Sequence, residues 1–352
     1  MRVIPGQEVL KEYCPQTAKH YPFLPRFTEA TRMHGGERNN VYLLRGEDGS
    51  RHVMRIIHHL TELSGVEYTN AWSAFVARFM PQAISPYLTK DHKSYFLCDG
   101  LATGLYPFAD GVYSDREVPE QRDALAAIQA RLHLIGLMYP DRKPRPDRPL
   151  LLHMDFEENF LYNWKAVLKM LNQGGKEMFE DQNHQNGPAQ AWIQKIYECR
   201  GAILEAKKDL EEFQRTIQKV EGLVYAPIHG DMYGHNILVR DNHISGILDW
   251  DECNREVLVY ELARTCWEYC KDSQRVVFIQ DRAERYLNVY QKNKGPAPES
   301  QWPYMIPLLR MLKFSEVMLY LHNAIIGDVW DPGYGYENLR ALMNLEGYVL
   351  IL

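Results

Sequence analysis

The stretch that decides the fold runs from Pro227 to Glu252 and reads PIHGDMYGHNILVRDNHISGILDWDE. The triplet His229-Gly230-Asp231 comes first, and Asn236 follows five residues after that aspartate. Two short apolar runs come next, separated by a polar turn at residues 241–243, and Asp249 follows the second run. This pattern predicts a β-hairpin over residues 237–248. Closing that hairpin brings Asn236 and Asp249 beside one another.

These residue types suit the transfer of a phosphoryl group. That reaction needs an oxygen nucleophile in line with the γ-phosphate of a nucleotide and a divalent metal to neutralise its charge. Asp231, on a loop before a strand, can accept the proton of an attacking hydroxyl. Asn236 and Asp249 offer the hard oxygen ligands that Mg²⁺ prefers. We expect His229 to support the loop by hydrogen bonds rather than to act as a base.

The chain contains a second triplet of the same kind, His153-Met154-Asp155, followed by Asn159. Short triplets occur by chance, and an aspartate in a loop often caps a helix or a turn. Here the asparagine lies four residues on, and neither an apolar strand nor a second acidic strand end follows. We interpret this copy as an ordinary helix start. The stretch from Pro227 is favoured because three elements agree there.

The decisive stretch resembles the catalytic core of the aminoglycoside phosphotransferase family, which includes choline kinases and type II homoserine kinases. The family pattern, HGDxxxxN followed by a hairpin and an IDWE-like end, is matched in order and spacing. The resemblance implies an α+β, protein-kinase-like fold of two lobes. It also implies an enzyme that uses Mg²⁺ and ATP or GTP to phosphorylate a hydroxyl of a small molecule. Aminoglycosides, other hydroxylated antibiotics, amino alcohols and hydroxy amino acids are candidate acceptors.

The pattern along the chain agrees with two lobes. Residues 1–108 are rich in short β-branched runs and turn signals, including strands at 41–44, 52–57, 94–98 and 101–108 and one helix at 65–79. Residues 109–352 carry helical patterns at 119–137, 156–171 and 191–220, with a polar loop at 174–188. We therefore expect a small β-rich N-lobe and a larger, mostly helical C-lobe.

The N-lobe candidates come from the resemblance. Kinase-like folds place a cation on the strand after the phosphate-covering loop and pair it with a glutamate on the following helix. Here the cation is Arg55, in the run HVMRII, and the expected partner is Glu67, with Glu62 as the alternative. An exposed strand arginine is the competing interpretation of Arg55.

Two further N-lobe features match the family. The turn GGERNNVY resembles the family's GGxxNxVY turn over the triphosphate, which assigns Gly36 and Asn39 to the nucleotide. By position, the backbone from Tyr106 to Phe108 is expected to meet the adenine as the hinge between the lobes. Adjacent glycines also occur in turns of other kinds, so this evidence is weaker than that of the catalytic stretch.

The helical half supplies structural and acceptor candidates. Val259 to Ala263 resembles the family's YDLA helix, with Glu261 in the place of the aspartate that braces the catalytic loop, and His133 is expected to be structural. The acceptor site lies between the catalytic loop and the C-lobe helices, and an acidic and aromatic group there would fit an amino-bearing acceptor. The candidates in that group are Asp251, Glu252, Trp267 and Glu268. The competing interpretation places Trp267 in the core and Glu268 in solvent.

Composition excludes several other classes of function. The net charge of −6 and the lack of a basic run interleaved with aromatics argue against a nucleic-acid partner. The most apolar segment, 305–326, contains Arg310, Lys313 and Glu316 and is expected to be a buried helix rather than a membrane span. The N-terminus lacks the apolar stretch of a secretory signal. Six cysteines without a CxxC pair are expected to be core thiols of a cytoplasmic protein.

Two other readings of the same fold remain. A protein Ser/Thr kinase would need a long activation segment, whereas Asp249 here leads quickly into a helical pattern. A nucleotide-binding pseudokinase or scaffold would have no physical need for Asp231, Asn236 and Asp249 together. The sequence leaves open the acceptor, the choice between ATP and GTP, and the oligomeric state.

Overall fold

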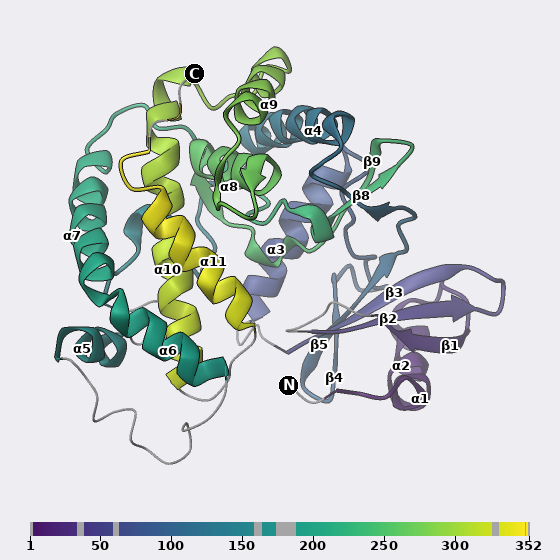
Figure 1. The fold of residues 1–352 in the computed structure, drawn as a ribbon. Helices are drawn as coiled ribbons and strands as arrows, with labels where there is room; N and C mark the ends of the chain where they lie inside the picture. The colour runs from purple at the N-terminus through teal and green to yellow at the C-terminus, as the bar shows by residue number, and fades with distance from the viewer. Residues whose placement is uncertain are drawn as a thin grey trace.

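The computed structural model describes residues 3–33, 39–58, 63–157, 164–173, 188–325, 331–348 and 350. Figure 1 shows a small sheet lobe at the lower right and a larger group of helices at the left and top. This is the two-lobe, α+β architecture expected from the sequence.

The N-lobe is built on an antiparallel sheet with strand order β1-β2-β3-β5-β4. Its strands are β1 (Phe27–Arg32), β2 (Asn39–Gly46), β3 (Arg51–Ile57), β4 (Phe96–Cys98) and β5 (Leu101–Pro107). The predicted hairpins are confirmed, and β1 is a strand that the sequence patterns did not indicate. Three short helical segments precede the sheet, namely α1 (Gly6–Glu8), the π-helical η1 (Val9–Tyr13) and α2 (Cys14–His20). Their apolar residues join one core cluster with those of the sheet.

Buried and half-buried side chains alternate along most of β3. His52, Met54 and Ile56 are buried, whereas Val53 and Arg55 are only half-buried. Because successive side chains of a strand point to opposite faces, Arg55 lies on the face opposite the N-lobe core. Arg55 is therefore available for contacts with the C-lobe.

The C-lobe is mostly helical, and its core forms one large apolar cluster. Its α-helices are α4 (Pro119–Met138), α5 (Lys165–Gln173), α6 (Pro188–Glu198), α7 (Arg200–Ile217), α8 (Leu258–Cys270), α9 (Gln280–Lys292), α10 (Met305–Ile325) and α11 (Pro332–Asn344). Short 3-10 helices lie at η2 (Leu151–His153), η5 (Gly234–Asn236), η6 (Trp250–Glu252) and η7 (Glu299–Tyr304).

Small sheets of the C-lobe carry the decisive stretch. One has strand order β6-β8-β9 and consists of β6 (Val112–Tyr113), β8 (Ile237–Arg240) and β9 (His243–Ile247). A second pairs β7 (Tyr225–Pro227) with β10 (Arg255–Val257), and a third pairs β11 (Lys271–Asp272) with β12 (Val277–Phe278). The predicted hairpin over 237–248 is thereby confirmed.

The helix that follows the N-lobe strands, α3 (Leu63–Ala77), packs against the helical core. Trp72 and Val76 are fully buried in the C-lobe cluster, and Trp72 Nε1 donates a hydrogen bond to the Ile228 carbonyl at 3.1 Å. Ile228 directly precedes the triplet His229-Gly230-Asp231. One buried indole thus connects α3 to the loop that carries Asp231.

Some predicted boundaries are wrong. The single helix expected over 191–220 is two helices, because Cys199 leaves the helical conformation (φ −92°, ψ 6°) between α6 and α7. The helix expected from 156 is α5, which begins at Lys165. Residues 158–163 and most of the expected loop at 174–188 lie outside the described residues. Within the described part of the chain, no helix is both long and apolar enough to cross a bilayer.

Candidate active site

The hairpin brings the two expected metal ligands together. Ile237 pairs with Ile247, and beyond that pair the Leu248 N–H donates to the Asn236 carbonyl at 2.8 Å. Asp249 follows directly and has a left-handed backbone conformation (φ 55°), which ends the strand sharply. Asn236 is buried, whereas the Asp249 side chain is 49% exposed. The spatial proximity inferred from the spacing is therefore present.

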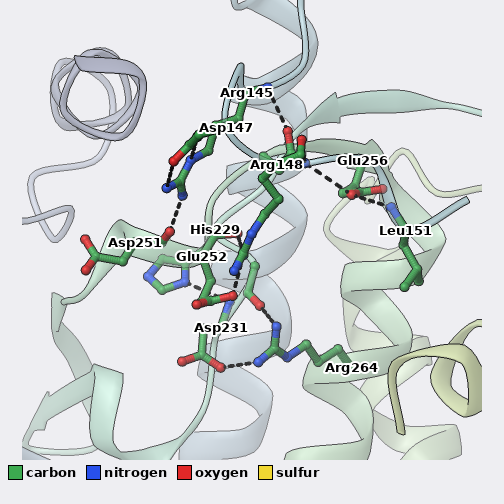
Figure 2. Close-up of polar contacts among 12 residues, drawn as sticks. Arg145, Asp147, Arg148, Leu151, His229, Asp231, Asp251, Glu252, Glu256 and Arg264 are labelled. Atoms are coloured by element: carbon green, nitrogen blue, oxygen red, sulfur yellow. Dashed lines mark hydrogen bonds and ion pairs between the residues drawn. The ribbon is translucent and has the colours of Figure 1, made fainter. Parts of the chain in front are cut away.

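Asp231 lies beside these ligands and both of its carboxylate oxygens accept hydrogen bonds. Arg264 Nη2 donates to Oδ1 at 2.6 Å, and Asn236 Nδ2 donates to Oδ2 at 2.9 Å (Figure 2 shows the contact with Arg264). Burial raises the pKa of Asp231 to about 7; Arg264 opposes the shift, and nearby carboxylates add to it. Such a pKa suits a group that must accept a proton near neutral pH.

His229 holds the catalytic loop, as expected. The ring is fully buried, its Nε2–H donates to the Leu248 carbonyl at 2.8 Å, and its Nδ1 accepts from the Asp231 N–H at 3.2 Å. Both bonds fit the neutral imidazole with its proton on Nε2. Burial lowers the pKa of His229, which favours that neutral form. His229 therefore links the start of the loop to the strand end that carries Asp249.

Glu261 braces the loop from α8, which confirms its expected structural part. Its Oε1 accepts the Gly230 N–H at 2.6 Å, and its Oε2 accepts from His133 Nε2 at 2.8 Å. His133 is itself buried and its Nδ1 contacts the Tyr290 hydroxyl at 2.7 Å. Burial raises the pKa of Glu261, but the hydrogen bond from His133 and the adjacent charges leave it below its ordinary value. Glu261 is thus an ionised, fully buried acceptor.

Arg55 connects the N-lobe to the end of the hairpin that carries Asp249. Nη2 donates to Asp249 Oδ1 at 3.0 Å, and Nη1 donates to Asp251 Oδ1 at 2.9 Å. The expected ion pair with Glu67 is wrong, because Glu67 is exposed on α3 and accepts a hydrogen bond from the Tyr95 hydroxyl at 3.1 Å. The alternative, Glu62, lies outside the described residues.

The expectation that Asp251 faces an acceptor is also wrong. Besides Arg55, its carboxylate accepts a hydrogen bond from Asn39 Nδ2 at 3.2 Å, so two N-lobe side chains contact it. The reason is the sharp turn at Asp249, after which the short helix η6 directs Asp251 toward β2 and β3. Asp251 therefore belongs with Asp249 on the side of the N-lobe.

The segment that follows α4 makes hydrogen bonds to the backbone of η6. Arg145 makes two hydrogen bonds to the Asp147 carboxylate, at 2.5 and 2.8 Å, and its Nη1 donates to the Asp251 carbonyl (Figure 2). The Arg145 N–H donates to Asn254 Oδ1 at 2.9 Å, and Arg148 pairs with Glu252. Arg145 is only 3% exposed. The segment fixes the backbone from which Asp251 and Glu252 project.

The remaining acceptor candidates separate into two groups. Trp267 is fully buried and packs edge-on against Phe278, so its assignment to the acceptor is wrong and the core interpretation is correct. Glu252 and Glu268 are partly exposed, and their charges raise the pKa of Asp231, which places both near it. Glu268 pairs with Lys271 at 2.8 Å.

Two of the other nucleotide candidates, Tyr106 and Phe108, lie in and directly after strand β5. Tyr106 is in β5 opposite Val53, and its hydroxyl donates to Asn70 Oδ1 at 3.4 Å. Phe108 follows β5, and the Arg51 guanidinium lies 4.1 Å from the centre of its ring. Gly36 lies outside the described residues. The contact of this hinge with a nucleotide base stays a prediction.

The donor set of the hairpin end fits a hard divalent cation. The amide nitrogen of Asn236 donates a hydrogen bond to Asp231, so its amide oxygen is the atom that can bind a metal. Asp249 offers a carboxylate on a side chain that is half exposed. No group of three or more His, Cys, Asp or Glu side chains is arranged for a metal within the described residues. A divalent cation bound there would take its other ligands from substrate phosphates and waters.

Residues 29–298 match the model of the phosphotransferase enzyme family. The chain belongs to that family. The matched range spans β1 to the end of the segment after α9 and includes the whole catalytic stretch.

Solved structures share the fold over nearly the whole chain. Amicoumacin kinase hAmiN, in complex with AMP-PNP, Ca²⁺ and Ami, is 16% identical with a TM-score of 0.64, covering 97% of this chain and 93% of that one. Spectinomycin phosphotransferase APH(9)-Ia, in complex with ADP and spectinomycin, is 13% identical with a TM-score of 0.65, covering 97% and 95%. Choline kinase LicA from Streptococcus pneumoniae is 12% identical with a TM-score of 0.57, covering 96% and 98%. At these identities the likeness is one of fold.

Sequence reasoning missed two arginines of the site. Arg264 lies three residues after Glu261 on the same helix, so extending the helical pattern by one turn would have placed it beside the loop. Arg145 lies in the proline-rich segment PDRKPRPDRP, which has no periodicity. No local signal indicates that the segment returns to η6.

Proposed function

We propose that the protein transfers the γ-phosphate of ATP or GTP to a hydroxyl of a small molecule. Asp231 accepts the hydroxyl proton, and Asn236 and Asp249 hold Mg²⁺, which bridges and neutralises the phosphates. The observation that carries the proposal is the convergence of these three side chains at one end of the β8–β9 hairpin. Arg55 lies at the same end and supplies the cation for the phosphates.

The structure also supports a part for Asp251 in place of its earlier assignment. Asp249 and Asp251 both accept hydrogen bonds from Arg55, so both carboxylates face the region where N-lobe and hairpin meet. We assign Asp251 to the nucleotide side, together with Asn39. Glu67, being exposed and bonded to Tyr95, has no such part.

A small acceptor is favoured over a protein. Only η6 and β10 separate Asp249 from α8, which leaves no room for the long activation segment that orders a peptide substrate in protein kinases. All three catalytic side chains are present, which argues against a scaffold without activity.

The carboxylates around Glu268, one of the charges that raise the pKa of Asp231, favour an acceptor that carries an amine. Lys271 pairs with Glu268 and Glu337, and Lys313 pairs with Glu316. The two lysine side chains are each 6% exposed, whereas the three carboxylates are 18–31% exposed. The lysines therefore lie beneath the carboxylates, and the acidic groups face outward. An aminoglycoside, an amino alcohol or a hydroxy amino acid fits this charge.

The test compares nucleotide binding with and without Mg²⁺, followed by a screen for phosphate transfer. The screen covers aminoglycosides, other hydroxylated antibiotics, homoserine, choline and sugars, with casein as the protein acceptor. Asp249→Ala is expected to abolish the Mg²⁺-dependent part of ATP binding. His243→Ala, an exposed position on the same hairpin, is the matched control and should bind normally. Metal dependence that survives unchanged in Asp249→Ala would remove that residue from the site.

A further inference from the structure

Two side chains of α8, one helical turn apart, form hydrogen bonds to the same residue of the catalytic loop, Gly230. Glu261 accepts the Gly230 N–H at 2.6 Å, and Arg264 Nη1 donates to the Gly230 carbonyl. Arg264 Nη2 reaches the next residue and donates to Asp231 Oδ1 at 2.6 Å (Figure 2). Residues three apart share one face of a helix, so both side chains reach the loop from the same direction.

The geometry fixes the plane of the Asp231 carboxylate. Arg264 holds Oδ1 and Asn236 holds Oδ2, so the group is held at both oxygens. Each carboxylate oxygen can accept more than one hydrogen bond, so a second donor, such as an acceptor hydroxyl, can still bind. Asp231 is 22% exposed and Arg264 is 17% exposed, so the carboxylate remains accessible from one side.

The contacts of Arg264 depend on its planar guanidinium group, which has two terminal nitrogens. One guanidinium donates simultaneously to a backbone carbonyl and to the side chain of the following residue. A lysine ammonium keeps the charge but is a single point on a flexible stem, so it cannot reproduce both contacts in one fixed geometry. Charge and geometry can therefore be separated by substitution.

We propose that Arg264 is a positioning residue that aims the Asp231 carboxylate at the acceptor hydroxyl. The inference rests on the proposed function, because it concerns the orientation of the group that accepts the proton. Arg264 contacts Asp231, whereas Arg55 contacts Asp249 and Asp251, so Arg264 acts through Asp231 and takes no part in binding the nucleotide. Its loss should therefore change turnover rather than nucleotide affinity.

The kinetic test uses Arg264→Met, which keeps the apolar stem, and Arg264→Lys, which keeps the charge. We expect Arg264→Met to lower kcat by about 10- to 100-fold, the range for a misplaced catalytic group, while the KM for ATP stays within about 2-fold. Arg264→Lys should recover part of the loss. Arg285→Met is the control, since Arg285, which is exposed on α9, makes a forked contact with Asp123 of α4.

Amide hydrogen exchange of the peptide 225–236 gives a readout that needs no acceptor. Arg264→Met should speed exchange in this peptide in the free protein, and Arg285→Met should not. Unchanged exchange, or unchanged kcat in Arg264→Met while the wild type transfers phosphate, overturns the inference and leaves the proposed function intact. A wild type that neither binds Mg²⁺–ATP nor transfers phosphate overturns the proposed function, and the inference with it.

Discussion

Two Arg–Asp pairs with similar hydrogen-bond distances differ in burial, which allows a quantitative prediction. Arg145 contacts Asp147 at 2.5 and 2.8 Å, and Arg51 contacts Asp110 at 2.7 and 2.8 Å. The side chains of the first pair are 3% and 13% exposed, whereas those of the second are 38% and 55% exposed. The same substitution in each pair therefore compares the loss of a buried ion pair with the loss of an exposed one.

Asp147→Asn should lower the free energy of unfolding by about 3–5 kcal/mol. Removing one partner leaves a buried charge uncompensated, and that is the usual cost. Asp110→Asn should cost less than about 1 kcal/mol, because water screens the exposed pair. The loss at Asp147 is a large part of the roughly 5–15 kcal/mol by which a domain is stable.

Urea unfolding followed by tryptophan fluorescence measures both losses as a shift of the midpoint at constant slope. Asp147→Asn combined with Arg145→Met should cost less than the sum of the single changes, by about 0.5–3 kcal/mol, because the two residues are in contact. Equal and small losses at the buried and the exposed pair would refute the reasoning. Because Arg145 also donates to the Asp251 carbonyl, we expect Arg145→Met to weaken nucleotide binding as well.

Further predictions concern the loop and its surroundings. Asp231→Asn should lower turnover by at least about 10²-fold with nucleotide binding retained. Because burial raises the pKa of Asp231 to about 7, the wild-type kcat/KM should fall as pH drops below that value. Gly230→Ala should destabilise the protein more than Gly222→Ala in thermal unfolding, because both have positive φ but only at Gly230 would a Cβ meet backbone, 2.3 Å from the Glu252 carbonyl oxygen. Burial raises the pKa of Glu256 to about 8, so its contribution to stability is complete below its unfolded pKa near 4.5 and is lost as pH rises toward 8. Glu256→Gln should therefore gain urea stability over the wild type between pH 5 and pH 8, and a gap independent of pH would contradict this.

Part of the site could be predicted from the sequence because it is local. The spacing of Asp231, Asn236 and Asp249 along one hairpin fixes their proximity, since a hairpin of known length brings its two ends together whatever surrounds it. Helical periodicity and turn residues likewise indicated the two lobes. Glu261 and His133 followed from the resemblance: Glu261 contacts the loop, as expected, and His133 is structural and contacts Glu261.

The partners of these residues were decided only by the tertiary structure. Which acid pairs with Arg55, whether Trp267 faces a ligand or the core, and how Arg145 returns to η6 all depend on segments far apart in the chain. A charged side chain pairs with an oppositely charged group that the packing brings close to it. The separation of two residues along the chain does not give their distance in the folded protein. The sequence by itself therefore determined the fold and the chemistry of the hairpin, while the packing of the two lobes determined which side chains hold that chemistry in place.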